Sequence, residues 1–147
     1  MIHLFAGFPR ALDALAAAVP SLPPAATEPP DDRGAFVSRG RALFGRVYGA
    51  DAARVLSRIE ALDPSLAAWV LEDAYGRVLS RGGLTPADRE RLAVAMLAAQ
   101  GLRNQLAGHV RGALLCGATA AEIEVSLAAA SPWIAPDDLA AARAALQ

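Results

Sequence analysis

Apolar residues recur at helical spacing along nearly the whole chain, and helix start and stop signals divide them into segments. We expect helices over residues 35–47, 52–62, 65–79, 86–100, 102–116 and 120–130, and a short last helix from residue 136. The expected N-terminal caps are Asp51, Asp63, Thr85 and Thr119, the last in a capping box with Glu122. Residues 92–99 are apolar nearly all round, so this helix should be central.

The first third of the chain has a different organisation. Residues 1–18 predict an apolar helical segment with a break near Gly7 and Pro9. Residues 19–34 contain five prolines, which favours an extended connector, and residues 35–147 form the main helical domain. Since 18 residues cannot form a core alone, we expect the segment to pack on the main domain or on a neighbouring subunit.

Composition supports an all-α fold. The chain has 36 Ala and 20 Leu but only 9 Val, 4 Ile and 3 Thr among its 147 residues. Alanine and leucine are strong helix formers, whereas strands favour β-branched residues. The apolar fraction of 54% excludes intrinsic disorder, and the surplus of apolar faces favours a homo-oligomer.

Net charge and cysteine content indicate which classes of partner and which cellular compartment to expect. The net charge of −1 gives no electrostatic case for nucleic acid or an anionic membrane, and no apolar run reaches the roughly 18 residues of a membrane span. The single Cys116 excludes an internal disulfide and fits a reducing compartment. With no pattern typical of a signal peptide, we expect a cytoplasmic protein without nucleic-acid or membrane partners.

Two polar residues are candidates for chemistry: His109 in an otherwise apolar helical stretch and Glu90 in the charged first turns of the preceding helix. His109 lies in the middle of one helix and Glu90 in the helix before it, on either side of a bend at Gly101. If these helices are antiparallel neighbours, the two residues differ by roughly 5 Å along the axis at 1.5 Å rise per residue, which side chains can span. A carboxylate beside an imidazole fixes its tautomer and makes a general acid–base pair. The alternative is a core histidine and a solvated glutamate.

Other candidate chemistry is weaker. No second ligand stands at helical spacing from His109, so we expect no metal site. Cys116 follows two leucines and fits a buried structural thiol better than a nucleophile. Arg103 and Arg111, near His109 in the sequence, are candidates to meet an acidic substrate or to be structural. The two tryptophans, Trp69 and Trp133, are interpreted as core or interface anchors.

About residues 36–130 resemble the carboxymuconolactone decarboxylase family, whose fold is all-α and alkylhydroperoxidase-D-like. The resemblance is carried by Tyr75-Gly76, by the helix start at Leu84-Thr85, by His109 with Ala113, and by the segment Gly117-Ala118-Thr119 with Glu122-Ile123. It implies a homo-oligomer, a trimer or hexamer. IHLFAGFPRALDAL at the N-terminus is similar to an element that ordinarily follows the Glu-Ile helix of the family, so residues 1–18 either replace that element or match it by coincidence.

The chain departs from the peroxidase members of this family at the thiols. Their pattern is Glu, eleven residues, Cys, two residues, Cys, three residues, His. Its glutamate falls on Glu90 and its histidine on His109, while the cysteine positions fall on Leu102 and Gln105. A dithiol peroxidase cycle is therefore disfavoured, because Cys116 lies outside the pattern without a resolving partner.

The resemblance is closer to the decarboxylase branch, which also lacks the cysteine pair and works without cofactor. It implies that His109 carries a proton, that Glu90 orients it, and that Gln105 and Tyr75 are polar neighbours in the pocket of a small carboxylated substrate such as a lactone. Arg111 is a further candidate for substrate binding because it lies near His109 in the sequence. The alternative function is a non-catalytic, oligomeric protein of this fold that binds small molecules or has a structural role.

Overall fold

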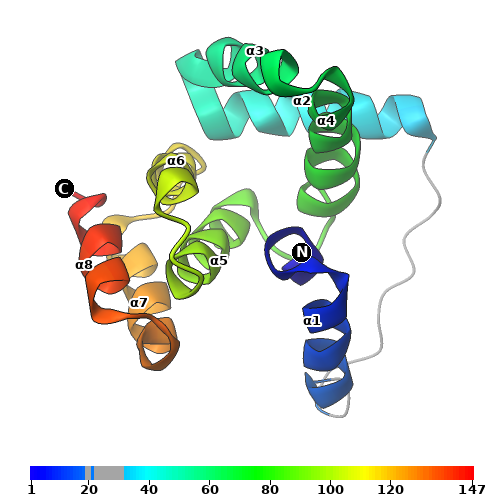
Figure 1. Ribbon diagram of the computed structural model, residues 1–147. Coiled ribbons are helices and arrows are strands. Elements are labelled where there is room, and N and C mark those ends of the chain that lie inside the picture. Colours follow the sequence, from blue (N-terminus) through cyan, green and yellow to red (C-terminus); the bar gives the residue numbers. More distant parts are fainter. Residues whose placement is uncertain (19–20, 22–31) are drawn as a thin grey trace.

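A computed structural model describes residues 1–18, 21 and 32–147. Within these residues the regular secondary structure is entirely helical. The extended connector expected over residues 19–34 lies almost wholly outside the described residues. Figure 1 shows three parts: α1 at the N-terminus, the helices α2 to η3, and the helices α5 to α8.

The helices begin and end close to the positions that the sequence predicts. They are α1 (Ile2–Ala18), α2 (Arg33–Tyr48), η2 (Gly49–Asp51), α3 (Ala52–Leu62), α4 (Pro64–Trp69), η3 (Val70–Leu79), α5 (Pro86–Ala99), α6 (Arg103–Leu115), α7 (Ala120–Ala130), η4 (Ser131–Trp133) and α8 (Pro136–Ala144). The side chains of Asp63, Thr85 and Thr119 cap helices as expected, and Thr119 forms the capping box with Glu122. Asp51 was expected to cap α3 but makes no such bond, because its carboxylate pairs with Arg54 at 2.9 Å.

One predicted helix has an unexpected winding. Residues 65–79 were expected to form a single helix, but only α4 is an α-helix and η3 continues it as a π-helix. The π winding extends to Ser80, whose backbone N–H donates to the carbonyl of Tyr75 at 3.0 Å. Such wide turns are rare and are not encoded by apolar periodicity, so the sequence pattern could not distinguish them from an α-helix.

The close contact between α2 and η3 depends on two glycines. A Cβ atom on Gly40 would lie 1.9 Å from the carbonyl oxygen of Leu71, and one on Gly76 would lie 2.1 Å from the carbonyl oxygen of Phe36. The two backbones therefore approach more closely than any side chain allows. This contact fixes the position of Tyr48 at the end of α2 relative to Tyr75 in η3.

Helix α5 lies at the centre of the second group, as its apolar circumference predicts. It contacts α1, α6, α7 and α8, and forms a hairpin with α6 through a turn at Gly101, where φ is 67°. Val94, Val110, Ile123 and Leu127 are fully or almost fully buried in the core between these helices. A second cluster of buried residues is centred on Phe44, Val47, Leu71 and Tyr75.

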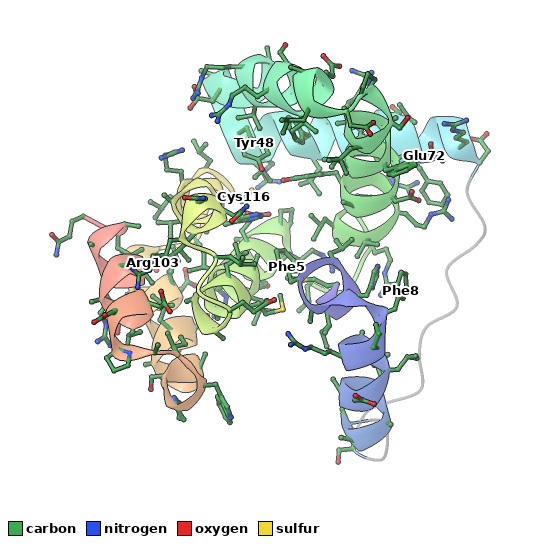
Figure 2. All side chains as sticks on the ribbon, in the orientation of Figure 1. Phe5, Phe8, Tyr48, Glu72, Arg103 and Cys116 are labelled. Atoms are coloured by element: carbon green, nitrogen blue, oxygen red, sulfur yellow. The ribbon has the colours of Figure 1, made fainter. Side chains whose placement is uncertain are left out.

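The N-terminal segment packs on the main domain through its first turns, and beyond the kink Ala11 is also buried. Its kink at Gly7, where φ is 76°, agrees with the predicted break. Phe5 packs against the core cluster and Phe8 is 71% exposed, and Figure 2 shows these two side chains on opposite sides of α1. Beyond the kink, Leu12 and Leu15 are also exposed.

The tryptophans are not in the core. Trp69 at the end of α4 is 59% exposed and Trp133 in η4 is 74% exposed. Of the two interpretations, core or interface anchors, the core position is wrong for both tryptophans, because more than half of each side chain is exposed. A role at a subunit interface stays a prediction.

Gly40→Ala is expected to destabilise the protein by at least about 2 kcal/mol, because the new methyl group would overlap a backbone carbonyl. Gly45→Ala is the matched control on the same helix, since a methyl group added there would meet nothing within 4 Å. It should be neutral or stabilise by up to about 1 kcal/mol through helix propensity. Urea unfolding would measure both, and equal stabilities of the two variants would contradict the close-contact interpretation.

Candidate functional site

Glu90 and His109 meet across the α5–α6 hairpin. The Nδ1 atom of His109 lies 2.8 Å from the Oε2 atom of Glu90. Glu90 is only 2% exposed and the side chain of His109 is 14% exposed. The alternative of a solvated glutamate is therefore wrong. A buried carboxylate is costly unless it is paired, and the imidazole N–H is the partner that this site provides.

A glycine makes room for this pair. A Cβ atom on Gly112, one turn after His109, would lie 2.9 Å from Oε2 of Glu90 and 2.8 Å from a methyl group of Val47. Since Val47 is 1% exposed, neither neighbour has free space to move into. The small residue thus lets α6 approach both α5 and the end of α2.

The contact with Glu90 determines which nitrogen of His109 is available. When Nδ1–H donates to the carboxylate, the neutral imidazole has its lone pair on Nε2. Among the described residues, no hydrogen bond to Nε2 is formed. The ring of Phe5 contacts the imidazole edge-on, with 5.7 Å between ring centroids at an interplanar angle of 72°.

Two tyrosines lie next to the pair. Their ring centroids lie 6.2 Å apart, and Tyr75 is 4% exposed whereas Tyr48 is half-buried. Burial raises the pKa of Tyr48, and the charge of Glu90 adds to this increase. The pKa of Tyr75 is raised well above its ordinary value, chiefly by burial. Both phenols therefore stay neutral hydrogen-bonding groups near Glu90 at physiological pH.

His109 and Tyr48 line two cavities. The first, of about 310 Å³, lies between α3 and α6 and is lined by polar residues that include Arg54, Arg58 and Arg111. The second, of about 440 Å³, is mainly apolar and lies between α1, α3, α4 and η3. His109 and Tyr48 therefore stand where a polar and an apolar space meet.

The other predicted site residues are distributed over these two cavities. Gln105 and Arg111 line the polar cavity and Tyr75 lines the apolar one. Arg103 does not reach either, because its guanidinium pairs with Asp138 of α8. Within the described residues, no three metal-ligating side chains lie together. Nor is any described helix both long and apolar enough to cross a membrane.

Several residues that line the cavities were not predicted from the sequence. Tyr48, Arg54, Arg58 and Phe5 line the cavities but belong to α1, α2 and α3, far from His109 in the sequence. Arg54 and Arg58 stand one helical turn apart on α3, which is a signal for a shared face. Arginines at this spacing usually lie on a solvated helix face, so the spacing alone does not indicate that Arg54 and Arg58 line a cavity.

Comparison with known proteins places this geometry in context. Peroxisomal protein 2 of Schizosaccharomyces pombe is 33% identical over 125 residues, which are 80% of this chain and 57% of the relative. The chain thus spans little more than half the length of that relative. The name places the relative in the peroxisome, so the expected cytoplasmic location of this chain stays a prediction.

A family model supplies the classification. The model of the carboxymuconolactone decarboxylase family matches residues 65–147, from α4 to the C-terminus, and so includes both Glu90 and His109. The match reaches further towards the C-terminus than the segment on which the sequence resemblance was based. With its helical architecture and more than half of its length matched, the chain belongs to the carboxymuconolactone decarboxylase family and has the all-α, alkylhydroperoxidase-D-like fold.

Proposed function

We propose that this protein catalyses cofactor-free proton transfer on a small carboxylated substrate, in a decarboxylation or in lactone processing. The observation that carries the proposal is the 2.8 Å contact between buried Glu90 and Nδ1 of His109, a residue that lines both cavities. This contact leaves Nε2 as the nitrogen that can exchange a proton with a substrate. Family membership supports the same reaction class.

The proposed step uses each group in a defined role. In a decarboxylation, the bond from the carboxylate carbon to its neighbour breaks, CO₂ leaves, and the electron pair remains on the substrate. Protonated His109 then delivers its Nε2 proton to the substrate carbon that holds this electron pair, and solvent reprotonates the imidazole. Glu90 stabilises the imidazolium and holds the ring, while the neutral hydroxyl of Tyr48 donates to substrate oxygen. Gln105, Tyr75 and Arg111 are the proposed substrate-binding side chains.

The alternative function is a non-catalytic binding protein of this fold. The two cavities support it as well, because a ligand could occupy them without reacting. The two proposals differ in what His109 must do, since a binding protein requires its shape and hydrogen bond, whereas an enzyme requires its proton.

His109→Ala is expected to lower turnover at least about 100-fold, because the proton donor is lost. Glu90→Gln should lower it about 10- to 100-fold, since the amide cannot stabilise the imidazolium. A thermal-shift screen with small carboxylated lactones, keto acids and aromatic acids would first find a probe that binds the wild type, and CO₂ release or ring opening would then be followed.

His3→Ala is the matched control, since the ring of His3 stacks on Phe8 and lies outside both cavities. Circular dichroism would establish that all three variants are folded. Unchanged turnover in folded His109→Ala would contradict the catalytic proposal. Probe binding without turnover in the wild type would favour the non-catalytic function.

The thiol is not part of the proposed chemistry. Cys116 is 5% exposed, and burial raises the pKa of its thiol, with a further increase from the negative charge of Glu90. Among the described residues it is the only cysteine, so no disulfide cycle is available to it there.

Alkylation by iodoacetamide should show this. At pH 7.5 the native thiol is neutral, and we expect it to react at least about tenfold more slowly than in urea-unfolded protein. Because the pKa is raised, the native rate should still be rising at a pH at which the rate of the unfolded protein has already levelled off. Rapid alkylation at pH 7.5 would indicate a thiolate and reopen a peroxidase-type role.

We further propose that the protein is a homo-oligomer. The support is an apolar groove of about 470 Å³, lined by Leu84, Leu92, Met96 and Trp133 together with the N-terminal residues, in which almost no polar atom is exposed. Such surfaces mark contact sites in many proteins. The family resemblance favours a trimer or hexamer.

Light scattering should give a mass that is a multiple of 15.2 kDa. Trp133→Glu is expected to reduce that mass by placing a charge in the groove. Val125→Glu, at a position that is 64% exposed outside the groove, should leave it unchanged. A monomeric wild type would overturn the proposal.

A further inference from the structure

We propose that the site binds an organic anion with an extended apolar body, its carboxylate held by Arg58 and Arg111 and its body placed in the cavity bounded by Phe5 and Trp69. This inference names the substrate class of the site and rests on the proposed function of His109 for the position of the reacting atom. The proposed ligand has one carboxylate and one apolar end.

The polar cavity carries the charge that a carboxylate needs. Among its lining residues, the carboxylate of Asp51 is already paired with Arg54 at 2.9 Å. Within the part of the chain that the structure describes, Arg58 and Arg111 form no such ion pair. They come from α3 and α6, on different sides of the cavity, and each guanidinium can hold a carboxylate through two parallel hydrogen bonds.

The apolar cavity has the opposite character. Leu4 and Phe5 from α1, Ile59 from α3, and Leu66 and Trp69 from α4 line it. Its one carboxylate, Asp73, pairs with Arg77 at 3.1 Å and is half exposed. A second carboxylate on the ligand would meet apolar side chains and the negative charge of Asp73 here, so the site discriminates against a charge at this end.

The junction places the ligand relative to the acid–base pair. Among the described residues, Tyr48 and His109 alone line both cavities, and the ring of Phe5 contacts the imidazole edge-on. A ligand with its head among the arginines and its body beside Phe5 must pass these two side chains. Its atoms next to the carboxylate then lie closest to the imidazole, where a proton is needed in the proposed step.

The experiment measures binding, not turnover. Titration calorimetry would compare butanoate, hexanoate and octanoate, and octanamide as the neutral analogue of octanoate. Each added methylene should tighten binding about threefold to fourfold through burial. Octanoate should bind at least tenfold more tightly than octanamide because only the acid pairs with the arginines.

Two sets of variants test the binding of the carboxylate and of the apolar body of the ligand independently. Arg58→Gln combined with Arg111→Gln should abolish the preference for acid over amide and keep the dependence on chain length. Trp69→Ala should weaken the dependence on chain length and keep the preference for the acid. Because these side chains are exposed, the variants are expected to fold.

Matched controls exclude binding elsewhere. Arg10→Gln removes one exposed charge of α1, and Trp133→Ala removes the other exposed tryptophan, which lines a different groove. Both should bind octanoate like the wild type. A weaker complex with Trp133→Ala but not with Trp69→Ala would place the ligand in that groove and overturn the proposal.

Three further outcomes would also overturn it: no binding of octanoate at millimolar concentration, equal binding of acid and amide, or an acid preference that survives the double arginine variant. These outcomes are distinct from failure of the proposed function. If His109→Ala kept full turnover, the catalytic role would fail, while the response of octanoate binding to the arginine and tryptophan variants would still test the substrate class.

Discussion

The buried carboxylate of Glu90 is the constraint on which the site depends. An ionised group at 2% exposure has lost most of its hydration and must find its stabilisation inside the protein. His109 donates to it from the neighbouring helix, and Gly112 allows the helices to come close enough for that contact. The same charge acts on Tyr48, Tyr75 and Cys116, whose pKa values it helps to raise. One carboxylate thereby adds to the effect of burial on the pKa values of its neighbours and orients the imidazole.

Close backbone contacts position the residues that surround the Glu90–His109 pair. Gly40 and Gly76 bring α2 against η3, which positions Tyr48 opposite Tyr75 and beside His109. Helix α3 follows directly from the end of α2 through η2, so the arginines of α3 line the same cavity as Tyr48 and His109. The first turns of α1 complete the apolar side with Leu4 and Phe5. Residues from five parts of the chain thus surround a single histidine.

This arrangement separates two properties that a substrate must combine. Arginines gather on one side of the His109–Tyr48 junction and aliphatic and aromatic side chains on the other. A proton donor at such a boundary acts on a molecule that has one charged and one apolar end. The cofactor-free chemistry proposed here needs little more than orientation and a proton, because the leaving carboxylate supplies the electron pair.

The sequence by itself determined most of the helix boundaries, three of the four expected caps and the α5–α6 hairpin, and it offered the pairing of Glu90 with His109 as one of two alternatives. These features follow from local signals and from helix geometry, since residues on either side of one bend are related by a fixed rise per residue. The family followed from motifs within the same region. The π winding of η3, the exposure of the tryptophans and the contributions of Phe5, Tyr48, Arg54 and Arg58 were decided only by the tertiary structure. Their positions depend on how closely non-neighbouring backbones pack and on which side chains fill the space between them, and neither is written in the periodicity of one chain segment.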